Sequence, residues 1–446
     1  MVDDIVRNWI LDGIESGGLA AGSKLPGARE IASRCGISFL MAQRAIASLV
    51  QDGVLSCIPR RGAFVKPGWE ERLIANHLVL FSNTRKWIPK LRELMRTELP
   101  ELRLCSGFKR GMFEIRTTYT LQRDRNQYMD LAPVFNWCFP DKELFYSHPF
   151  QGFRESDGRL FGIPIDFSPR VLFCNTRLLK RYGIPLPPDG WEWGEFLEII
   201  RKFRRDLSDI EILNFTDSPY WWMNIFFRAG GKLIEREAGR MHHLCLNTPE
   251  SIHALRVLRE LHQALRPERR EPGLSQKFSS GNQLFSISDR NYLSTIRAAQ
   301  LTGWTTMPLP RIPGGKPLTA QATDLICIRQ ECTDDSSVEA FMRFMLSENV
   351  QTILGDLKTG IPILREAAEK SFADGDEQDA VFKQEMYNVT PDYNIDSSGI
   401  TEIIYYRLFK LIRESTPLEE AVAEFSRAVD LILTADNEMH KDAMWK

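Results

Sequence analysis

Two stretches decide how the N-terminal part of this chain folds: Lys24-Leu-Pro-Gly-Ala-Arg-Glu-Ile-Ala-Ser-Arg-Cys-Gly-Ile-Ser38 and Gly53-Val-Leu-Ser-Cys-Ile-Pro-Arg-Arg-Gly-Ala-Phe-Val65. The first predicts a helix that begins after Pro26-Gly27, then a tight turn, after which Ser38 caps a further helix. The second predicts two short strands joined by residues 59–62, a hairpin turn with two arginines at its tip.

The residues on either side complete this pattern. Four apolar residues upstream recur at helical spacing and predict a first helix: Ile5, Trp9, Ile10 and Ile14. The helix that Ser38 caps is expected to run to about Asp52-Gly53. Three helices and a hairpin in this order form a helix-turn-helix with a wing. Between Ser38 and Lys66 four cations face one acid, and two interpretations are open: a solvated charged surface, or a surface that holds DNA phosphates.

The motifs of this head, residues 1–68, follow the order of a known family. Three motifs resemble segments of GntR-type transcription regulators. Leu25-Pro-Gly-Ala-Arg29 resembles the segment that opens the second helix, and Gly36-Ile-Ser38 the turn that opens the recognition helix. Arg61-Gly-Ala-Phe-Val65 resembles the hairpin that forms the wing. The resemblance implies a homodimer on a palindromic operator in double-stranded DNA, with the recognition helix in the major groove. The residues expected at the DNA are Lys24, Arg29, Ser38, Phe39, Gln43, Arg44, Arg60, Arg61 and Gly62.

The recognition helix departs from that family at its first turns. The family carries Arg, Thr and Arg where this chain has Phe39, Met41 and Gln43. Glutamine can read adenine through two hydrogen bonds, which is worth about 1–3 kcal/mol of discrimination. Phe39 either contacts a thymine methyl group or belongs to the core. The operator sequence therefore does not follow from the resemblance.

The composition is that of a folded protein with several compact units. The chain has 446 residues, 43% hydrophobic and 26% charged, and its net charge of −2 requires any nucleic-acid binding to be local. Eight cysteines without a Cys-x-x-Cys pair favour free thiols in a reducing compartment. The N-terminus lacks the pattern of a secretion signal, and no run of 18 apolar residues occurs. We therefore expect a cytoplasmic protein that does not associate with membranes.

Residues 74–446 predict an α/β body. Short apolar segments that are typical of buried strands alternate with helical segments: strands at 77–81, 161–165 and 171–174, and helices at 87–99, 176–182 and 193–203. Neither a Gly-x-Gly-x-x-Gly fingerprint nor a Walker loop is present, so no cofactor is expected. The expected fold class is α+β for the head and α/β for the body.

The body carries a second resemblance. Four segments are similar, in order along the chain, to motifs of family 1 extracellular solute-binding proteins, the maltose-binding-protein-like group. They are Gly162-Ile-Pro-Ile-Asp166, Leu172-Phe-Cys-Asn175, Trp191-Glu-Trp-Gly-Glu-Phe196 and Ser218-Pro-Tyr-Trp-Trp222. Further matches follow at residues 278–289, 307–310, 341–362 and 417–421. The resemblance implies a two-lobed, type II periplasmic-binding-protein-like domain that closes on a solute held between its lobes. Aromatic platforms with a few polar groups suit a carbohydrate, specifically an oligosaccharide.

The same resemblance implies a set of ligand residues. Tyr220, Trp221 and Trp222 form either a sugar platform or core packing, and at least one of the two tryptophans is expected in the core. Two departures from the family, Ser168 in place of a carboxylate and Asn291 in place of a tryptophan, argue against maltose itself. Asn136 and Trp137 are expected in a loop after a strand, and Asp166, Ser168 and Arg170 at the first crossover between lobes. The full set is Asn83, Asn136, Trp137, Asp166, Ser168, Arg170, Tyr220, Trp221, Trp222, Asp289 and Asn291.

Three functions remain open at this point. The first is a ligand-responsive transcription regulator whose body senses a carbohydrate. The second is a sugar-binding protein of a transport system with a vestigial head. The third is a sugar-acting enzyme that uses Asp166 and Asp289, which would have to lie roughly 5–10 Å apart. No nucleophile, base and oxyanion hole assemble in the sequence, and His242-His243 has no further ligand at metal spacing, so neither an enzyme nor a metal site is expected.

Overall fold

The computed structural model describes residues 2–80, 85–105, 107–155, 157–215, 218–236, 242–266, 278–391, 398–414 and 416–444. The chain divides into two compact units, each with a hydrophobic core of its own. Unit 1 comprises residues 1–116, 127–129 and 326–344, and unit 2 comprises residues 117–126, 130–325 and 345–446. The eight cysteines are free thiols, as the sequence predicts.

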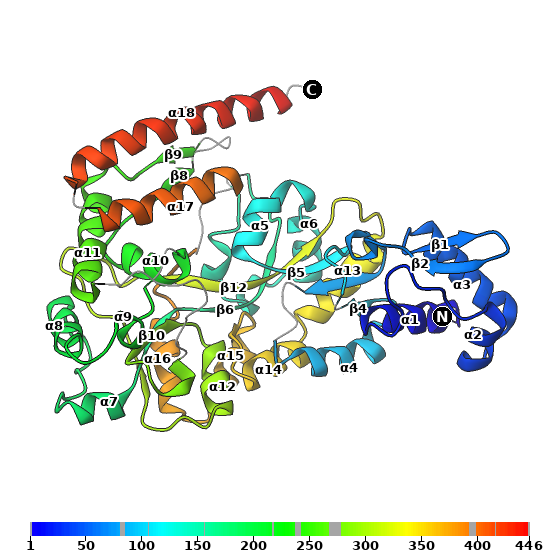
Figure 1. The fold of residues 1–446 in the computed structure, drawn as a ribbon, viewed down its shortest axis with the longest axis horizontal. Coiled ribbons are helices and arrows are strands. Elements are labelled where there is room, and N and C mark those ends of the chain that lie inside the picture. The colour runs from blue at the N-terminus through cyan, green and yellow to red at the C-terminus, as the bar shows by residue number, and fades with distance from the viewer. Residues whose placement is uncertain are drawn as a thin grey trace. The chain divides into compact units, whose positions relative to one another are not determined.

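The head of unit 1 has the predicted architecture (Figure 1). Its elements are α1 (Val2–Glu15), α2 (Ala28–Cys35), α3 (Phe39–Gln51), β1 (Leu55–Ile58) and β2 (Gly62–Val65). Gly36 ends α2 in the left-handed conformation, with φ of 66°, and the Ser38 hydroxyl accepts the backbone N–H of Met41 at 3.4 Å. β1 and β2 pair antiparallel and form the wing. Local cap and turn signals are therefore sufficient to define this part of the fold.

The rest of unit 1 consists of three parallel strands, which we call its sheet edge, and of helices. β3 (His77–Leu80) lies between β4 (Arg103–Cys105) and β5 (Phe113–Thr117) and is parallel to both. The other elements are the 3-10 turn η1 (Trp69–Glu71) and the helices α4 (Ile88–Glu98) and α13 (Asp335–Met345). Glu114 on β5 is fully buried, and its carboxylate accepts hydrogen bonds from Arg116, Tyr128 and Arg329. These hydrogen bonds and ion pairs compensate the buried negative charge of Glu114.

One hydrophobic core joins the head to this sheet edge. Val6, Ile10 and Ile14 of α1 belong to the same buried cluster as Val79 and Phe108. Compact unit 1 thus runs across the boundary near residues 68–74 that the sequence suggests, and that boundary stays a prediction. Residues of α1 and of these strands therefore contribute to one buried cluster.

Unit 2 contains the remaining strands in two main sheets. The strands of the larger sheet that lie in unit 2 have the order β13-β6-β12, and the division between the units falls within β12, at residues 325–326. Its strands in unit 2 are β6 (Ile163–Ser168), β12 (Thr319–Ile328), β13 (Ile361–Pro362) and β14 (Val389–Pro391), which is parallel to β12. The smaller sheet has the order β10-β7-β11, with β7 (Val171–Cys174) antiparallel to β10 (Phe285–Ser288) and β11 (Thr305–Met307). The chain passes from one sheet to the other directly, at residues 169–170.

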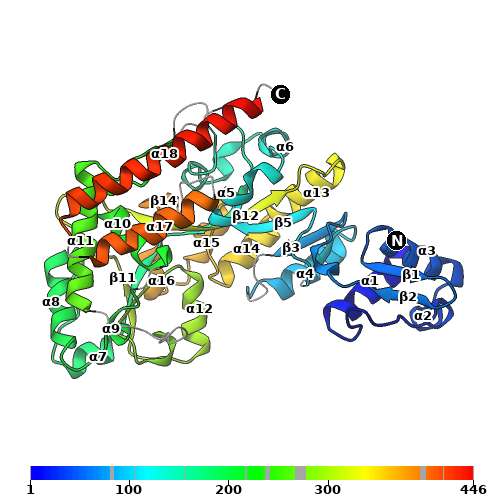
Figure 2. The same cartoon turned by 45° about the horizontal axis from the view of Figure 1, so that its top comes forward.

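Helices cover both sheets of unit 2, and the C-terminal helices α17 and α18 lie side by side next to α11 (Figures 1 and 2). The helices are α5 (Thr118–Asp124), α6 (Ala132–Cys138), α7 (Thr176–Arg181), α8 (Trp193–Phe203), α9 (Asp209–Ile212), α10 (Pro219–Arg228), α11 (Pro249–Leu265), α12 (Asn291–Ala298), α14 (Glu348–Asp356), α15 (Arg365–Ser371), α16 (Glu377–Glu385), α17 (Ser398–Arg413) and α18 (Leu418–Met444). A small hairpin consists of β8 (Ile234–Arg236) and β9 (His242–Leu244), and the 3-10 turns are η2 (Arg125–Gln127), η3 (Lys142–Leu144), η4 (His148–Phe150) and η5 (Phe278–Ser280). No helix in the described ranges is both long and apolar enough to cross a bilayer.

Candidate functional site

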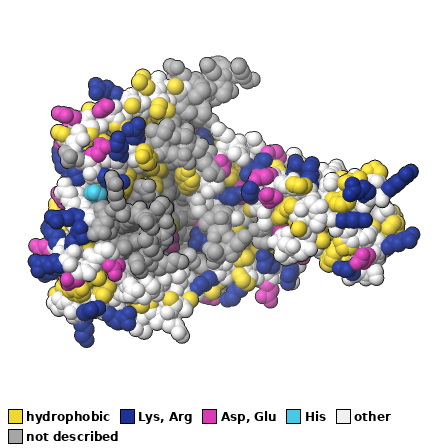
Figure 3. All heavy atoms as spheres, viewed as in Figure 1, with side chains coloured by type: hydrophobic (Ala, Val, Ile, Leu, Met, Phe, Trp, Pro, Cys, Tyr) yellow, Lys and Arg dark blue, Asp and Glu magenta, His cyan; other side chains and the backbone are white. Residues whose placement is uncertain are grey.

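The candidate DNA-binding face of the head is exposed and positively charged. Lys24, Arg29, Arg44, Arg60 and Arg61 all lie on its surface. Within the described part of the head, no carboxylate is paired with any of them. Figure 3 shows, on the face that it draws, several Lys and Arg side chains projecting from the head. Exposed cations that are not paired with a carboxylate are available to phosphates.

The first residues of α3 are presented to solvent. Phe39 is 43% exposed, so the interpretation that it belongs to the core is wrong, and its neighbour Leu40 is 56% exposed. The guanidinium of Arg29 lies 5.7 Å from the centre of the Phe39 ring, and Gln43 is exposed one turn further along the helix. Aromatic, amide and guanidinium groups at the N-terminal end of a recognition helix are suited to base edges and thymine methyl groups.

The wing presents its arginines on a tight turn. Arg60 has a φ of 63° and Gly62 a φ of 107°, so the predicted hairpin turn uses left-handed backbone at both positions. Arg61 lies 5.8 Å from the centre of the Phe64 ring. Lys24 pairs with Phe64 in an isolated bridge and so joins the segment before α2 to the wing.

A set of polar contacts connects the head to β4 inside unit 1. One guanidinium nitrogen of Arg103 donates at 2.8 Å to the carboxylates of both Asp12 and Glu15 on α1. Glu15 and Arg103 are 7% and 14% exposed in their side chains, so this pair is largely withdrawn from water. Arg7 on the same helix forms an ion pair with Asp52, which caps the end of α3, at 2.5 Å. Polar contacts thus lead from β4 through α1 to the far end of the recognition helix.

Three of the predicted ligand residues lie around the connection between the two sheets of unit 2: Ser168, Arg170 and Tyr220. The Ser168 hydroxyl, at the end of β6, accepts the backbone N–H of Arg290 at 2.9 Å. The backbone N–H of Arg170 donates to the Thr319 hydroxyl at 3.2 Å. The structure therefore brings the crossover at residues 168–170 together with the end of β10 and the start of β12.

Tyr220 lies in the middle of this group. The Arg170 guanidinium covers its ring at 4.4 Å from the centre, and Arg170 itself is only 3% exposed. The Tyr220 hydroxyl and the Ser288 hydroxyl are 3.0 Å apart, which fixes the ring's orientation. Trp221 meets Tyr220 edge to face at 4.8 Å and is half-buried. Tyr220 and Trp221 thus form an aromatic platform, and the Arg170 guanidinium already lies against one face of Tyr220.

Trp222 has a different position from its neighbour. It is fully buried and packs against Phe226 and Tyr405 in the core of unit 2. The expectation that at least one of the two tryptophans is core is therefore confirmed for Trp222, and its assignment to the ligand platform is wrong. Helix α10 begins at Pro219, and its helical period turns residues 222 and 226 to the same side.

Arg290 is a central residue of this region that the sequence did not reveal. It is fully buried and donates two hydrogen bonds to the Asp379 carboxylate, at 2.7 and 2.6 Å, and one to the Gly360 carbonyl at 2.6 Å. The Lys358 ammonium contacts the same carboxylate at 2.6 Å. Arg290 thus connects the end of β10, helix α16 and the turn before β13. A charged residue next to Asp289 in an apolar stretch was the only available signal.

The other predicted ligand residues lie apart from Tyr220 or in different settings. Asn136 and Trp137 are on helix α6 and not in a loop, and Trp137 is 71% exposed. The Asp166 carboxylate is buried, accepts the backbone N–H of Asp324 at 3.3 Å and lies against Gly360, where a Cβ atom would approach it to 2.5 Å. Asp289 and Asn291 are half-exposed at the start of α12. Asn83 lies outside the described residues.

Three carboxylates near α16 lie close enough together to suggest a cation site, but cations of the chain already neutralise them. Asp374, Asp376 and Asp379 have oxygens within 4.8 Å of one another. Lys358 contacts Asp374 and Asp379, and Arg297 pairs with Asp376. Together with Arg290, these side chains balance the charge of the cluster, which is therefore a structural network.

Two families match different parts of the chain. Residues 118–381, more than half of the sequence, match the family described as bacterial extracellular solute-binding protein. Residues 3–65 match the bacterial regulatory proteins of the gntR family, the range in which the winged helix-turn-helix is found. Neither family is defined by an enzymatic activity.

Solved solute-binding proteins share the fold of the body. Maltose-bound MalE3 of T. maritima has 13% sequence identity and a TM-score of 0.65, over 80% of this chain and 100% of that chain. The substrate-binding protein Lmo0181 from Listeria monocytogenes, in complex with cycloalternan, has 13% identity and a TM-score of 0.66, over 81% and 99%. UgpB from Mycobacterium tuberculosis, in complex with glycerophosphocholine, has 15% identity and a TM-score of 0.64, over 81% and 99%. The body therefore has the two-lobed α/β fold of these proteins.

Proposed function

We propose that this chain, which belongs to the bacterial extracellular solute-binding protein family and carries a gntR-type DNA-binding head, is a transcription regulator that senses a carbohydrate between the lobes of its body. It would act in the cytoplasm as a homodimer on a palindromic operator. The observation that carries the proposal is the junction in unit 1, where an intact winged helix-turn-helix shares one core with the first strands of the body. A vestigial head would need neither the exposed cations nor the packed junction.

The DNA part of the proposal is supported by the side chains on α3 and the wing. Arg44, Arg60 and Arg61 are exposed and would contact phosphates, while Phe39 and Gln43 would face bases. Phosphate contacts set the register of a protein on DNA, and base contacts set its sequence preference. Sequence-specific binding therefore needs both phosphate contacts and base contacts, and this head presents side chains for both on α3 and the wing.

The ligand part is supported by the group around Tyr220. The solved structures of similar fold include complexes with maltose and cycloalternan, and also one with glycerophosphocholine. Tyr220 and Trp221 offer aromatic surface, and Arg170, Ser168 and Ser288 offer polar atoms around it. A sugar has apolar C–H faces and many hydroxyls, which this combination suits. Because Arg170 covers one face of Tyr220, we place the sugar beside the Arg170–Tyr220 pair and not between its members.

The first experiment tests DNA and ligand separately on the full-length protein. Selection from a random duplex library should enrich a sequence with two half-sites about one helical turn apart. Arg61→Gln should then weaken binding to all sequences and lower the slope of affinity against salt by about one phosphate contact. A thermal-shift screen against mono- and oligosaccharides should find a stabilising sugar, since a ligand that binds the folded state raises the midpoint. Tyr220→Ala should abolish that shift.

Matched substitutions serve as controls for both measurements. Lys410 is an exposed cation on α17, and Lys410→Gln should leave DNA binding unchanged. Tyr406 is 69% exposed on the same helix, and Tyr406→Ala should leave the sugar's thermal shift unchanged. Sugar binding without any enriched DNA sequence would favour a transport protein, and enriched DNA without any sugar response would refute the sensor. Turnover of the bound sugar would instead indicate an enzyme.

Arg103 is expected to couple the two activities. Arg103→Met removes the cation shared by Asp12 and Glu15 and leaves the buried Glu15 carboxylate without its partner, which should lower the stability of unit 1 by about 2–3 kcal/mol. In the wild type we expect the sugar to change operator affinity by about 5- to 150-fold. In Arg103→Met this change should fall below about twofold, while sugar binding itself persists.

Two further variants separate coupling from simple folding. Arg103→Lys keeps a cation opposite Glu15 and should restore most of the sugar's effect on operator affinity. Arg92→Met replaces an exposed arginine of α4 and should change nothing. If Arg103→Met retains the full sugar effect, the coupling does not pass through Arg103.

A further inference from the structure

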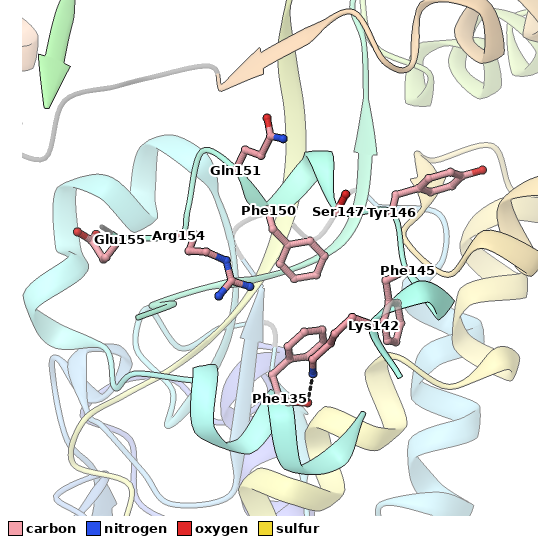
Figure 4. Close-up of a pocket in the computed structure, with 9 residues that line it drawn as sticks. All are labelled: Phe135, Lys142, Phe145, Tyr146, Ser147, Phe150, Gln151, Arg154 and Glu155. Atoms are coloured by element: carbon pink, nitrogen blue, oxygen red, sulfur yellow. Dashed lines mark hydrogen bonds between the residues drawn. The ribbon is translucent and has the colours of Figure 1, made fainter. Parts of the chain in front are cut away.

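Unit 2 contains a second hollow, formed by α6 and the segment that follows it (Figure 4). Its volume is about 400 Å³, within the range of small-molecule sites. The residues that line it are Phe135, Lys142, Phe145, Tyr146, Ser147, Phe150, Gln151, Arg154 and Glu155. None of them belongs to the group around Tyr220, so this hollow is distinct from the proposed sugar site.

Packed aromatic rings form the walls of this hollow. The Phe135 ring centre lies 5.7 Å from that of Phe145 and 5.4 Å from that of Phe150, and all three side chains are at most 5% exposed as residues. The backbone behind them is fixed, because the Gln321 side chain donates to the Pro149 carbonyl at 3.2 Å and Gly152 lies directly against Pro391. The walls are therefore preformed, and a flat apolar group could enter without their rearrangement.

Two cations lie at the hollow and give it a positive charge. The Lys142 ammonium stands 4.1 Å from the centre of the Phe135 ring and donates to the carbonyls of Phe135, at 3.2 Å, and Phe139, which leaves one of its three N–H groups for a ligand. Arg154 donates one hydrogen bond, to the Gly158 carbonyl at 3.3 Å. Partial burial and the nearby charge of Arg154 lower the pKa of Lys142. Two cations this close repel one another unless an anion lies between them.

The one carboxylate of the lining does not balance this charge. Glu155 forms an ion pair with Arg125 at 2.6 Å, and both side chains are only 8% exposed. The positive charges of Lys142 and Arg154 are therefore left for an external group. Figure 4 shows the Arg154 guanidinium directed towards the rings, and the Lys142 ammonium beside Phe135, at the carbonyl to which it donates.

We propose that this hollow binds a small organic carboxylate with a flat apolar body, as a second ligand of the protein. The body would lie in the hollow next to Phe150, and the carboxylate would accept hydrogen bonds from Arg154 and Lys142. Guanidinium and carboxylate match in geometry, and hydrogen bonds between charged groups are stronger than neutral ones.

Calorimetric titration of the full-length protein with 2-naphthoate tests the proposal, with 2-naphthalenemethanol as the neutral counterpart. We expect naphthoate to bind at least about tenfold more tightly than the alcohol, because the alcohol leaves both cations without a partner. Arg154→Gln should weaken naphthoate binding by about tenfold and leave the weak binding of the alcohol unchanged. Arg159→Gln, which removes a nearby arginine that pairs with Asp157 outside the lining, should have no effect.

A second variant places the ligand. Ser147→Trp fills the mouth of the hollow from an exposed position and should abolish naphthoate binding, whereas Tyr220→Ala should leave it intact. The proposal is overturned by absence of binding at millimolar naphthoate, by equal affinities for the acid and the alcohol, or by loss of binding in Tyr220→Ala with retention in Ser147→Trp. The last outcome would place naphthoate in the sugar site. Because none of these readouts involves DNA or sugar, they are independent of the proposed regulatory function.

Discussion

Asp379→Asn is expected to lower the free energy of unfolding of unit 2 by about 3–5 kcal/mol, because it removes the buried carboxylate that pairs with Arg290. Asparagine has nearly the same shape and keeps one acceptor, so the effect isolates the charge. Lys358 loses the same partner, although Asp374 still contacts it at 2.9 Å. Urea unfolding followed by hydrogen exchange in α12 and α16 measures the loss where Arg290 and Asp379 lie.

The control is a carboxylate whose ion pair is exposed to solvent. Glu339 pairs with Arg343 one turn along α13, and both side chains are well exposed. Glu339→Gln should therefore change stability by no more than about 0.5 kcal/mol. If Asp379→Asn is equally silent, Arg290 does not depend on the carboxylate, and the buried network contributes nothing to the frame of the ligand site.

This frame matters because Arg290 connects elements that carry the proposed ligand residues. Its backbone N–H holds the Ser168 hydroxyl, and its guanidinium holds the Gly360 carbonyl next to Asp166. Arg290 therefore connects α16 to the crossover at residues 168–170 through hydrogen bonds of its side chain and its backbone. We infer that Arg290 positions the site and does not itself contact the sugar.

The sequence predicted the head well because its signals are local. Ser38 as an N-cap, the tight turn before it and the hairpin turn at residues 59–62 each act within a few residues, and each is found as expected. The helices predicted at 176–182 and 193–203 are likewise found as α7 and α8. Periodicity and caps define such elements without knowledge of the rest of the fold.

The site was harder to predict because its contacts join distant parts of the chain. Arg290 meets Asp379 across 89 residues, and Arg103 meets Glu15 across 88. No spacing rule links such pairs. The placement of Asn136 and Trp137 in a loop was an avoidable error, since Pro133 in the first turn of α6 is a helix-start signal. The roles assigned to individual DNA and ligand residues stay predictions.

The junction between head and body is expected to open on acidification, through His77. Burial, and secondarily the positive charges of Arg103 and Arg7, lowers the pKa of His77 from 6.5 to about 3. The ring donates from Nδ1 to the Ala75 carbonyl at 3.1 Å and lies against Phe108, so it is held neutral. Between these two pKa values the unfolded chain binds one more proton than the folded one. The contribution of His77 is therefore complete above pH 6.5 and is lost as the pH falls towards 3, at up to about 1.4 kcal/mol per pH unit.

Hydrogen exchange of the β3 amides in the full-length protein at pH 7, 6 and 5, corrected for intrinsic rates, measures this slope. His77→Phe keeps a flat ring beside Phe108 and should remove the pH dependence at β3. His148 is a matched comparison in unit 2, since burial lowers its pKa to about 4. His148→Phe should leave the β3 slope intact and reduce the acid sensitivity of unit 2 only. Equal slopes in the wild type and His77→Phe would mean that a different group takes up the proton, and the junction would then owe its acid sensitivity to the carboxylates that face Arg103.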